Sequence, residues 1–133
     1  MSALFKKMNL TTQAEIAVFN APQSFDGELK ALKDVKILRD PNKPSKLKFA
    51  LAFAVTQSQL DRYSALLAAG SEGDAILWFA YPKGTSKRYQ CEFNRDQGWR
   101  VIRAAGFDSV RQVAIDADWS ALRFRRLAYV KKS

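Results

Sequence analysis

Blocks of apolar and polar positions alternate along this chain and predict alternating strands and helices. Residues 48–55 and 75–81 are apolar at successive positions, which is typical of central strands covered by helices on both faces. Strand-forming residues at 14–20 and 35–39 predict two further strands. Two later segments, 110–116 and 121–130, flank a turn at 117–120 and predict an antiparallel hairpin.

Helical spacing predicts the elements between these strands. Phe25, Leu29 and Leu32 recur at one face of a helix over residues 25–33. A capping box at residues 56–59 starts the next helix, which carries Leu60, Tyr63 and Leu67 inward and stops at Gly70. Two more helices are expected: residues 2–9, and a segment with its N-cap at Asn94, with Trp99, Ile102 and Ala105 inward and its end at Gly106.

The order of these elements predicts one domain over residues 1–133. We expect an α/β, three-layer Rossmann-like fold whose mostly parallel sheet of about six strands ends in an antiparallel hairpin. Ligands of such sheets bind beyond the carboxyl ends of the strands, where the strand order reverses. The candidate rim therefore comprises Asn20, Asp40, Thr56, Lys83 and residues 116–120, with the reversal point at the first strand.

Composition narrows the chemistry. The chain of 133 residues has a single cysteine, so it cannot form an internal disulfide. It has no histidine, which is the commonest metal ligand and the residue that usually activates a catalytic nucleophile. We predict no catalytic residue, no metal and no cofactor, and lean against an enzyme. The lack of a long apolar run predicts no membrane partner, and together with the absence of an export signal it favours a cytoplasmic protein.

The net charge of +9 lies mainly in the second half of the chain. Residues 83–133 contain 12 Lys and Arg against 5 Asp and Glu. This excess favours an anionic small molecule, an acidic protein or nucleic acid as partner. A solvated surface explains the charge equally well. The oligomeric state is not predicted.

A basic loop after the strand at 75–81 is the first candidate site. Lys83, Lys87, Arg88 and Arg95 flank a Gly-Thr-Ser segment and lead to the helix expected at Asn94. Both ends of a parallel crossover lie at the same rim, so these cations and the helix N-terminus could converge on an anion. The spacing does not match a phosphate-binding loop, and a flexible surface loop has the same composition.

The turn of the hairpin is the second candidate. Asp116 and Asp118 stand beside Trp119 and Ser120, so two carboxylates and an aromatic ring could orient a ligand or supply a base. The structural alternative is commoner for these residue types. In that case the carboxylates satisfy the turn backbone and pair with Arg111 or Arg123, and Trp119 covers the sheet edge.

The last strand is also basic, with the sequence LRFRRL at residues 122–127 followed by Lys131 and Lys132. These side chains are candidates for non-specific contacts with nucleic-acid phosphates. Alternatively, Arg123 and Arg125 keep one strand face solvated or protect an edge from aggregation.

The second half of the chain, residues 94–130, resembles that of class I methyltransferases, whose sheet ends in an antiparallel hairpin after a helix. The resemblance implies an S-adenosylmethionine site after the first strand and an acidic residue, here Asp40, on the ribose. The chain departs from that pattern because VFNAPQ at residues 18–23 has no glycine. Asp40 before proline is also ordinary turn chemistry.

Four segments resemble a family of small bacterial proteins known only as a domain of unknown function. They are VFNAP at 18–22, LWFAYPK at 77–83, NRD at 94–96 and VAIDADWSALRF at 113–124. This resemblance implies the fold and assigns no catalytic residue.

The leading hypothesis is a non-catalytic Rossmann-like module that binds an anionic ligand or an acidic partner at its rim. The binding residues proposed are Lys83, Lys87, Arg88, Arg95, Asp116, Asp118, Trp119, Asn20 and Asp40. The alternatives are a diverged S-adenosylmethionine-dependent methyltransferase that uses Asp40 and Asp118, and a protein that associates non-specifically with nucleic acid.

Overall fold

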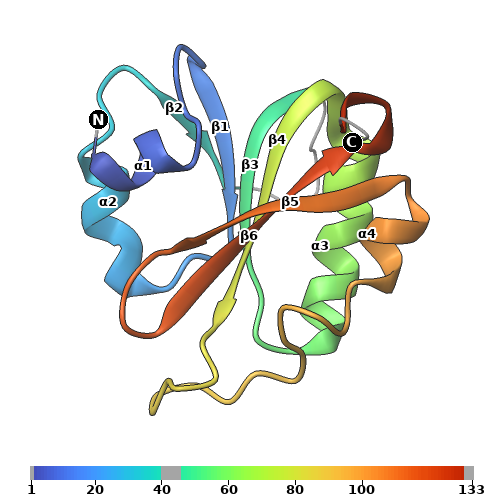
Figure 1. The fold of residues 1–133 in the computed structure, drawn as a ribbon. Coiled ribbons are helices and arrows are strands. Elements are labelled where there is room, and N and C mark those ends of the chain that lie inside the picture. Colours follow the sequence, from blue (N-terminus) through green and yellow to red (C-terminus); the bar gives the residue numbers. More distant parts are fainter. Residues whose placement is uncertain (1, 40–45, 131–133) are drawn as a thin grey trace.

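One mixed sheet lies at the centre of the computed structural model, which describes residues 2–39 and 46–130 (Figure 1). Within these residues, six strands follow the order β2-β1-β3-β4-β6-β5. The parallel strands are β1 (Glu15–Phe19), β2 (Lys36–Leu38), β3 (Leu47–Phe53) and β4 (Ser71–Pro82). The antiparallel hairpin consists of β5 (Phe107–Ala114) and β6 (Trp119–Arg126). The predicted fold class is confirmed.

The strand order reverses at β1, as predicted. β1 pairs with β2 on one side and with β3 on the other, so the chain turns back across its first strand. The carboxyl ends of β1 and β3 therefore lie side by side at this point. Ligands of open α/β sheets often bind at such a position, but no residue of β1 or β3 lines the cleft described below.

Helices cover both faces of the sheet (Figure 1). α1 (Ala3–Lys7) and α2 (Asp26–Lys30), the latter preceded by a 3₁₀ turn at Gln23–Phe25, pack on one face. α3 (Gln57–Gly70) and α4 (Arg100–Ala104) pack on the other. None of the described helices is long and apolar enough to cross a membrane.

β4 contributes to both halves of the core because successive strand residues point to opposite faces. Phe79 faces α3 and α4, where its ring contacts those of Trp99 and Phe124. Trp78 faces α1, and its indole Nε1 donates a hydrogen bond of 2.9 Å to the carbonyl of Met8. This bond fixes the end of the N-terminal helix against a central strand.

The predicted start of the third helix is wrong. Asn94 accepts hydrogen bonds from the backbone N–H groups of Asp96 and Gln97, as an N-cap would, but α4 begins only at Arg100. Gly98, with φ of +108°, leaves the helical region and ends the turn that Asn94 starts. Ala105, which was expected to face inward, is exposed.

The hairpin lies earlier in the chain than the pattern predicted. β5 begins at Phe107, directly after Gly106, whose φ of +94° turns the chain out of α4. β6 ends at Arg126 and a 3₁₀ turn follows at Leu127–Tyr129. The turn between the strands occupies residues 115–118 instead of 117–120.

Candidate functional site

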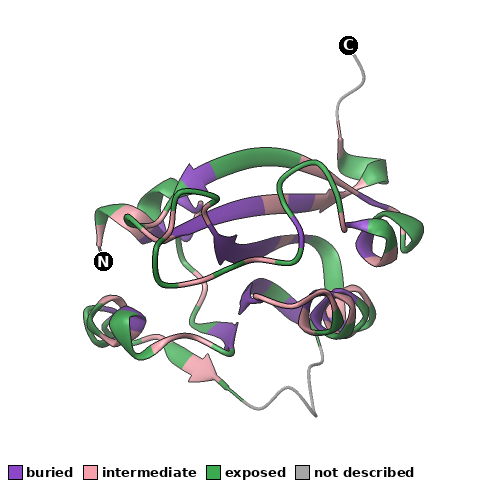
Figure 2. Cartoon of the chain, turned by 90° about the horizontal axis from the view of Figure 1, so that it is seen from below, coloured by how far each residue is buried: buried purple, intermediate pink, exposed green. Residues whose placement is uncertain are grey.

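The carboxyl ends of the parallel strands and the hairpin turn meet at one rim of the sheet. Figure 2 views the molecule from this side and shows a largely exposed loop across the rim. This segment, residues 83–99, connects β4 to α4 and is called the crossing loop below. Its two halves are attached to different parts of the rim.

The first half of the crossing loop is attached to the hairpin turn. The N–H of Lys83 donates to the carbonyl of Asp118 at 2.8 Å, and the hydroxyl of Ser86 donates to the Asp118 carboxylate at 2.8 Å. The Ser86 Oγ in turn accepts from the N–H of Tyr89 at 3.2 Å. The ring of Tyr89 packs on the buried indole of Trp119 with 4.9 Å between centroids. Hydrogen bonds and ring packing together hold residues 83–89 in place.

The second half crosses to β3 and the start of α3. The N–H of Glu92 donates to the carbonyl of Val55 at 3.1 Å, and the Glu92 carboxylate accepts from the N–H of Gln57 at 2.8 Å. A carboxylate at a helix N-terminus is favourable because the free N–H groups there carry partial positive charge. The Gln57 side chain donates to the carbonyl of Gly98 at 2.7 Å and closes the far end of the loop.

A cleft of about 950 Å³ opens between the crossing loop and the ends of β4, β5 and β6. Its cationic lining residues are Lys83, Lys87, Arg88 and Arg95, and its single acidic lining residue is Asp96. The other lining residues are Tyr81, Pro82, Gly84, Thr85, Ser86, Tyr89, Gln90, Cys91, Phe93, Asn94, Gln112 and Ser120. Four cations against one carboxylate leave a net charge of +3 around the cleft.

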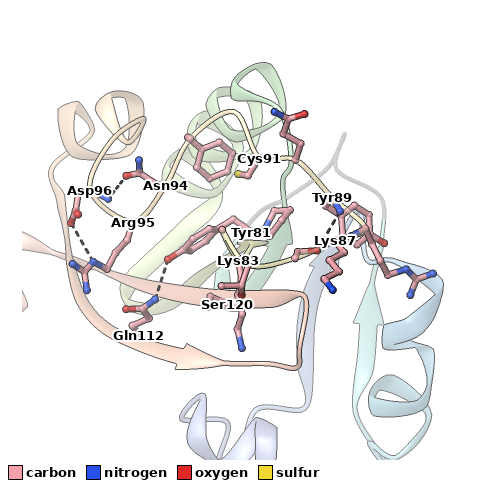
Figure 3. A pocket seen from close by; sticks show the side chains of 17 residues that line it. Tyr81, Lys83, Lys87, Tyr89, Cys91, Asn94, Arg95, Asp96, Gln112 and Ser120 are labelled. Carbon is pink, nitrogen blue, oxygen red and sulfur yellow. Dashed lines mark hydrogen bonds and ion pairs between the residues drawn. The ribbon is translucent and has the colours of Figure 1, made fainter.

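The cations occupy separate parts of the cleft. Figure 3 shows Arg95 near one end, Lys87 near the other and Lys83 between them. The Arg95 Nε lies 3.2 Å from the Asp96 carboxylate, an exposed ion pair that partly neutralises its end. No described carboxylate forms an ion pair with Lys83, Lys87 or Arg88. Of the four cations, only Arg95 has a described carboxylate within ion-pair distance.

Neutral polar groups line the cleft between the cations. The Gln112 side-chain amide donates to the hydroxyl of Tyr81 at 3.2 Å (Figure 3). Burial raises the pKa of Tyr81, so this phenol is neutral at physiological pH. Burial also raises the pKa of the Cys91 thiol, which is therefore largely protonated and a weak nucleophile. These groups favour binding by hydrogen bonds over nucleophilic attack.

The four predicted cations line one cleft, whereas Asp116, Asp118 and Trp119 have structural roles at the hairpin turn. Asp116 accepts from the N–H groups of Asp118 and Trp119 at 2.8 and 2.9 Å and so closes its own turn. Asp118 holds the crossing loop, and Trp119 is only 3% exposed beneath it. None of the three lines the cleft. The described ion pairs do not join Asp116 or Asp118 to Arg111 or Arg123.

Asn20 lies at the reversal point of the sheet. Its φ of 60° is in the left-handed region, which asparagine tolerates better than most residues. Its side-chain amide donates to the carbonyl of Phe53 at 2.9 Å and joins the ends of β1 and β3. Asn20 therefore occupies the gap between these strand ends. Asp40, predicted for the same region, lies outside the described residues.

The arginines of β6 bind to their own chain. Arg125 forms two hydrogen bonds with the Asp74 carboxylate, at 2.8 and 2.6 Å. Arg126 donates to the carbonyls of Ser71 and Gly73, both at 3.0 Å. Arg123 donates to the Asn9 side chain at 3.3 Å. These contacts within the chain disfavour phosphate binding by the basic strand. The predicted protection of a sheet edge is wrong, because β6 lies between β4 and β5.

Sequence reasoning missed the neutral part of the site. Gln112 is an exposed strand residue whose contact with Tyr81 spans 31 positions. Glu92 reaches Gln57 across 35 positions. No local pattern reports contacts of this kind. Tyr89 had a detectable signal, because it is an aromatic residue within an otherwise polar and basic segment. The described residues contain no group of three or more His, Cys, Asp or Glu side chains that could hold a metal.

Comparisons with solved structures show a class I methyltransferase-like fold. A SAM-dependent methyltransferase from Aquifex aeolicus matches with a TM-score of 0.64 and 11% identity over 92% of this chain and 87% of that one. The N-methyltransferase NodS from Bradyrhizobium japonicum matches with a TM-score of 0.58 and 11% identity over 92% of both chains. The magnesium protoporphyrin IX methyltransferase from Synechocystis, solved with bound SAM, matches with a TM-score of 0.59 and 12% identity over 92% of this chain and 74% of that one.

No protein-family model and no curated protein matches the sequence. At these low identities the structural matches establish the fold alone. The methyltransferase-like topology implied by the sequence resemblance is thereby confirmed, including the hairpin at the end of the sheet.

Proposed function

We propose that this methyltransferase-like domain is a binding module for an anionic ligand, which it takes in the cleft beneath the crossing loop. The observation that carries the proposal is the lining of that cleft, with four cations and one carboxylate. Oppositely charged groups raise the local concentration of a ligand and orient it. Lys83, Lys87 and Arg88 would contact the anion, because Arg95 already faces Asp96.

The attachment of the crossing loop supports this proposal. Cations on a free loop lose conformational entropy when a ligand fixes them, which weakens binding. Here Lys83 and Ser86 are bonded to Asp118, and Glu92 is bonded to Val55 and Gln57. The backbone that carries the cations is thus fixed before a ligand arrives.

A test compares two double variants of equal charge by titration calorimetry with inorganic pyrophosphate at low salt. Lys87→Gln with Arg88→Gln removes two cleft cations, and we expect about five- to tenfold weaker binding. Lys30→Gln with Lys33→Gln removes two exposed cations in and just after α2 and serves as the control. Equal weakening by both pairs would show a non-specific effect of net charge. Absence of pyrophosphate binding to the unaltered protein would refute the proposal.

A diverged methyltransferase is the second candidate, because the three solved structures compared above are methyltransferases by name. The residues after β1 do not fit the adenosyl cofactor. No glycine follows the strand, and the Asn20 side chain bridges to Phe53 where the backbone would have to approach the cofactor. Calorimetry with S-adenosylmethionine decides between the candidates. Binding that Asn20→Gly strengthens would favour the enzyme.

A further inference from the structure

Among the described residues that line the cleft, Tyr89 is the one aromatic residue that is partly rather than fully buried. Tyr81 and Phe93, which also line it, are 5% and 6% exposed. Tyr89 packs on Trp119 with 4.9 Å between ring centroids, and Trp119 packs on Phe53 at 5.1 Å. The ring is thus supported from the core while part of its surface remains open to the cleft.

This ring lies beside the cations of the cleft. Tyr89 follows Arg88 in the chain, and Figure 3 shows it next to Lys87. Its backbone N–H is bonded to Ser86, which is bonded to Asp118, so the backbone that carries the ring and these cations is held in place. A supported aromatic ring next to several cations is the combination that binds the base and the phosphate of a nucleotide.

We infer that the anionic ligand of the cleft is a nucleotide, with its phosphate at Lys83, Lys87 and Arg88 and its base against the Tyr89 ring. This inference rests on the proposed function and specifies its ligand. The cleft volume of about 950 Å³ is ample for one nucleotide. Gln112 and Ser120 also line the cleft and offer hydrogen-bonding groups to a base or a sugar.

Calorimetry with adenosine 5′-monophosphate and ribose 5-phosphate tests the inference, since the second probe has the same sugar and phosphate with a hydroxyl in place of the base. Base stacking on an aromatic ring predicts about tenfold tighter binding of the adenosine compound. Tyr89→Leu should abolish this difference and leave the affinity for ribose 5-phosphate unchanged, whereas Tyr89→Phe should preserve the difference. A melting curve of each variant checks that the fold is retained.

The outcomes separate this inference from the proposed function. Equal binding of both probes would overturn the inference that the ligand is a nucleotide and would leave the proposed anion site intact. An equal loss of both probes in Tyr89→Leu would also overturn it, because the ring would then only support the loop. If neither probe nor pyrophosphate binds, the proposed function itself fails. A 5′-phosphorylated tetra-adenylate identifies the source of the nucleotide: tighter, Tyr89-dependent binding indicates the end of a nucleic acid, and weaker binding indicates a free nucleotide.

Discussion

Replacing Gly98 by alanine should disrupt the far end of the crossing loop. Gly98 has φ of +108°, a conformation that residues with a side chain rarely adopt. A Cβ added there would lie 2.6 Å from the Cβ of Phe93 and 2.8 Å from the Oε1 of Gln57. The Gln57 side chain could move, but the Phe93 Cβ moves only with its backbone. Phe93 belongs to the core cluster on the α3 side of the sheet.

Two costs add at this position. A side chain in a sparsely populated backbone region costs about 1–3 kcal/mol, and overpacking costs about 1–3 kcal/mol. Partial relaxation of the exposed residues 94–97 lowers the sum, so we expect a loss of about 2–4 kcal/mol in the free energy of unfolding. For a chain of 133 residues, each kcal/mol corresponds to about 4 °C, so the melting temperature should fall by about 8–16 °C.

Urea denaturation and thermal melting of Gly98→Ala measure this loss, and Gly84→Ala is the matched control. Gly84 belongs to the same loop, but a Cβ added there meets no atom within 4 Å. The control should change stability by less than about 0.5 kcal/mol. If Gly98→Ala stays within about 1 kcal/mol of the unaltered protein, or if Gly84→Ala loses as much, residue 98 is not restricted to glycine by its backbone conformation and its approach to Phe93.

Three further changes test other parts of the structure. Hydrogen bonds from Arg125 lower the pKa of Asp74 from its ordinary value of 3.8. The pair therefore stabilises the fold at neutral pH, and this contribution is lost as acid protonates the carboxyl. Asp74→Asn should therefore lower the melting temperature by a few degrees near neutral pH and have a progressively smaller effect as acid protonates the carboxyl in the folded protein. An equal effect at neutral and at acidic pH would contradict this. Burial raises the pKa of Cys91, so its alkylation rate should reach half of its maximum at a higher pH than that of a free cysteine; a midpoint below that of free cysteine would show an activated thiol. Thr56→Ala removes the capping box of α3 and should cost about 1 kcal/mol in urea denaturation, whereas the exposed Ser58→Ala should cost less than half as much.

Local patterns in the sequence were sufficient for most of the elements. The capping box at Thr56 and the stop at Gly70 gave the bounds of α3, since both signals act within one helical turn. The same kind of signal failed at Asn94. Its side chain caps a turn there, but the packing of Gly98 against Phe93 and Gln57 prevents that turn from continuing into a helix.

The candidate site also has some features that the sequence predicts and others that only the tertiary structure reveals. The sequence by itself determined the α/β fold, the rim at which the strands end and the four cations of the loop, because these follow from periodicity and from neighbours along the chain. Only the tertiary structure decided that Asp118 and Trp119 hold the crossing loop and that Asn20 bridges β1 and β3. Only it brought Tyr81, Tyr89 and Gln112 to the same cleft. The physical reason is that these contacts join residues about 30 or more positions apart, so their geometry depends on how the whole sheet packs.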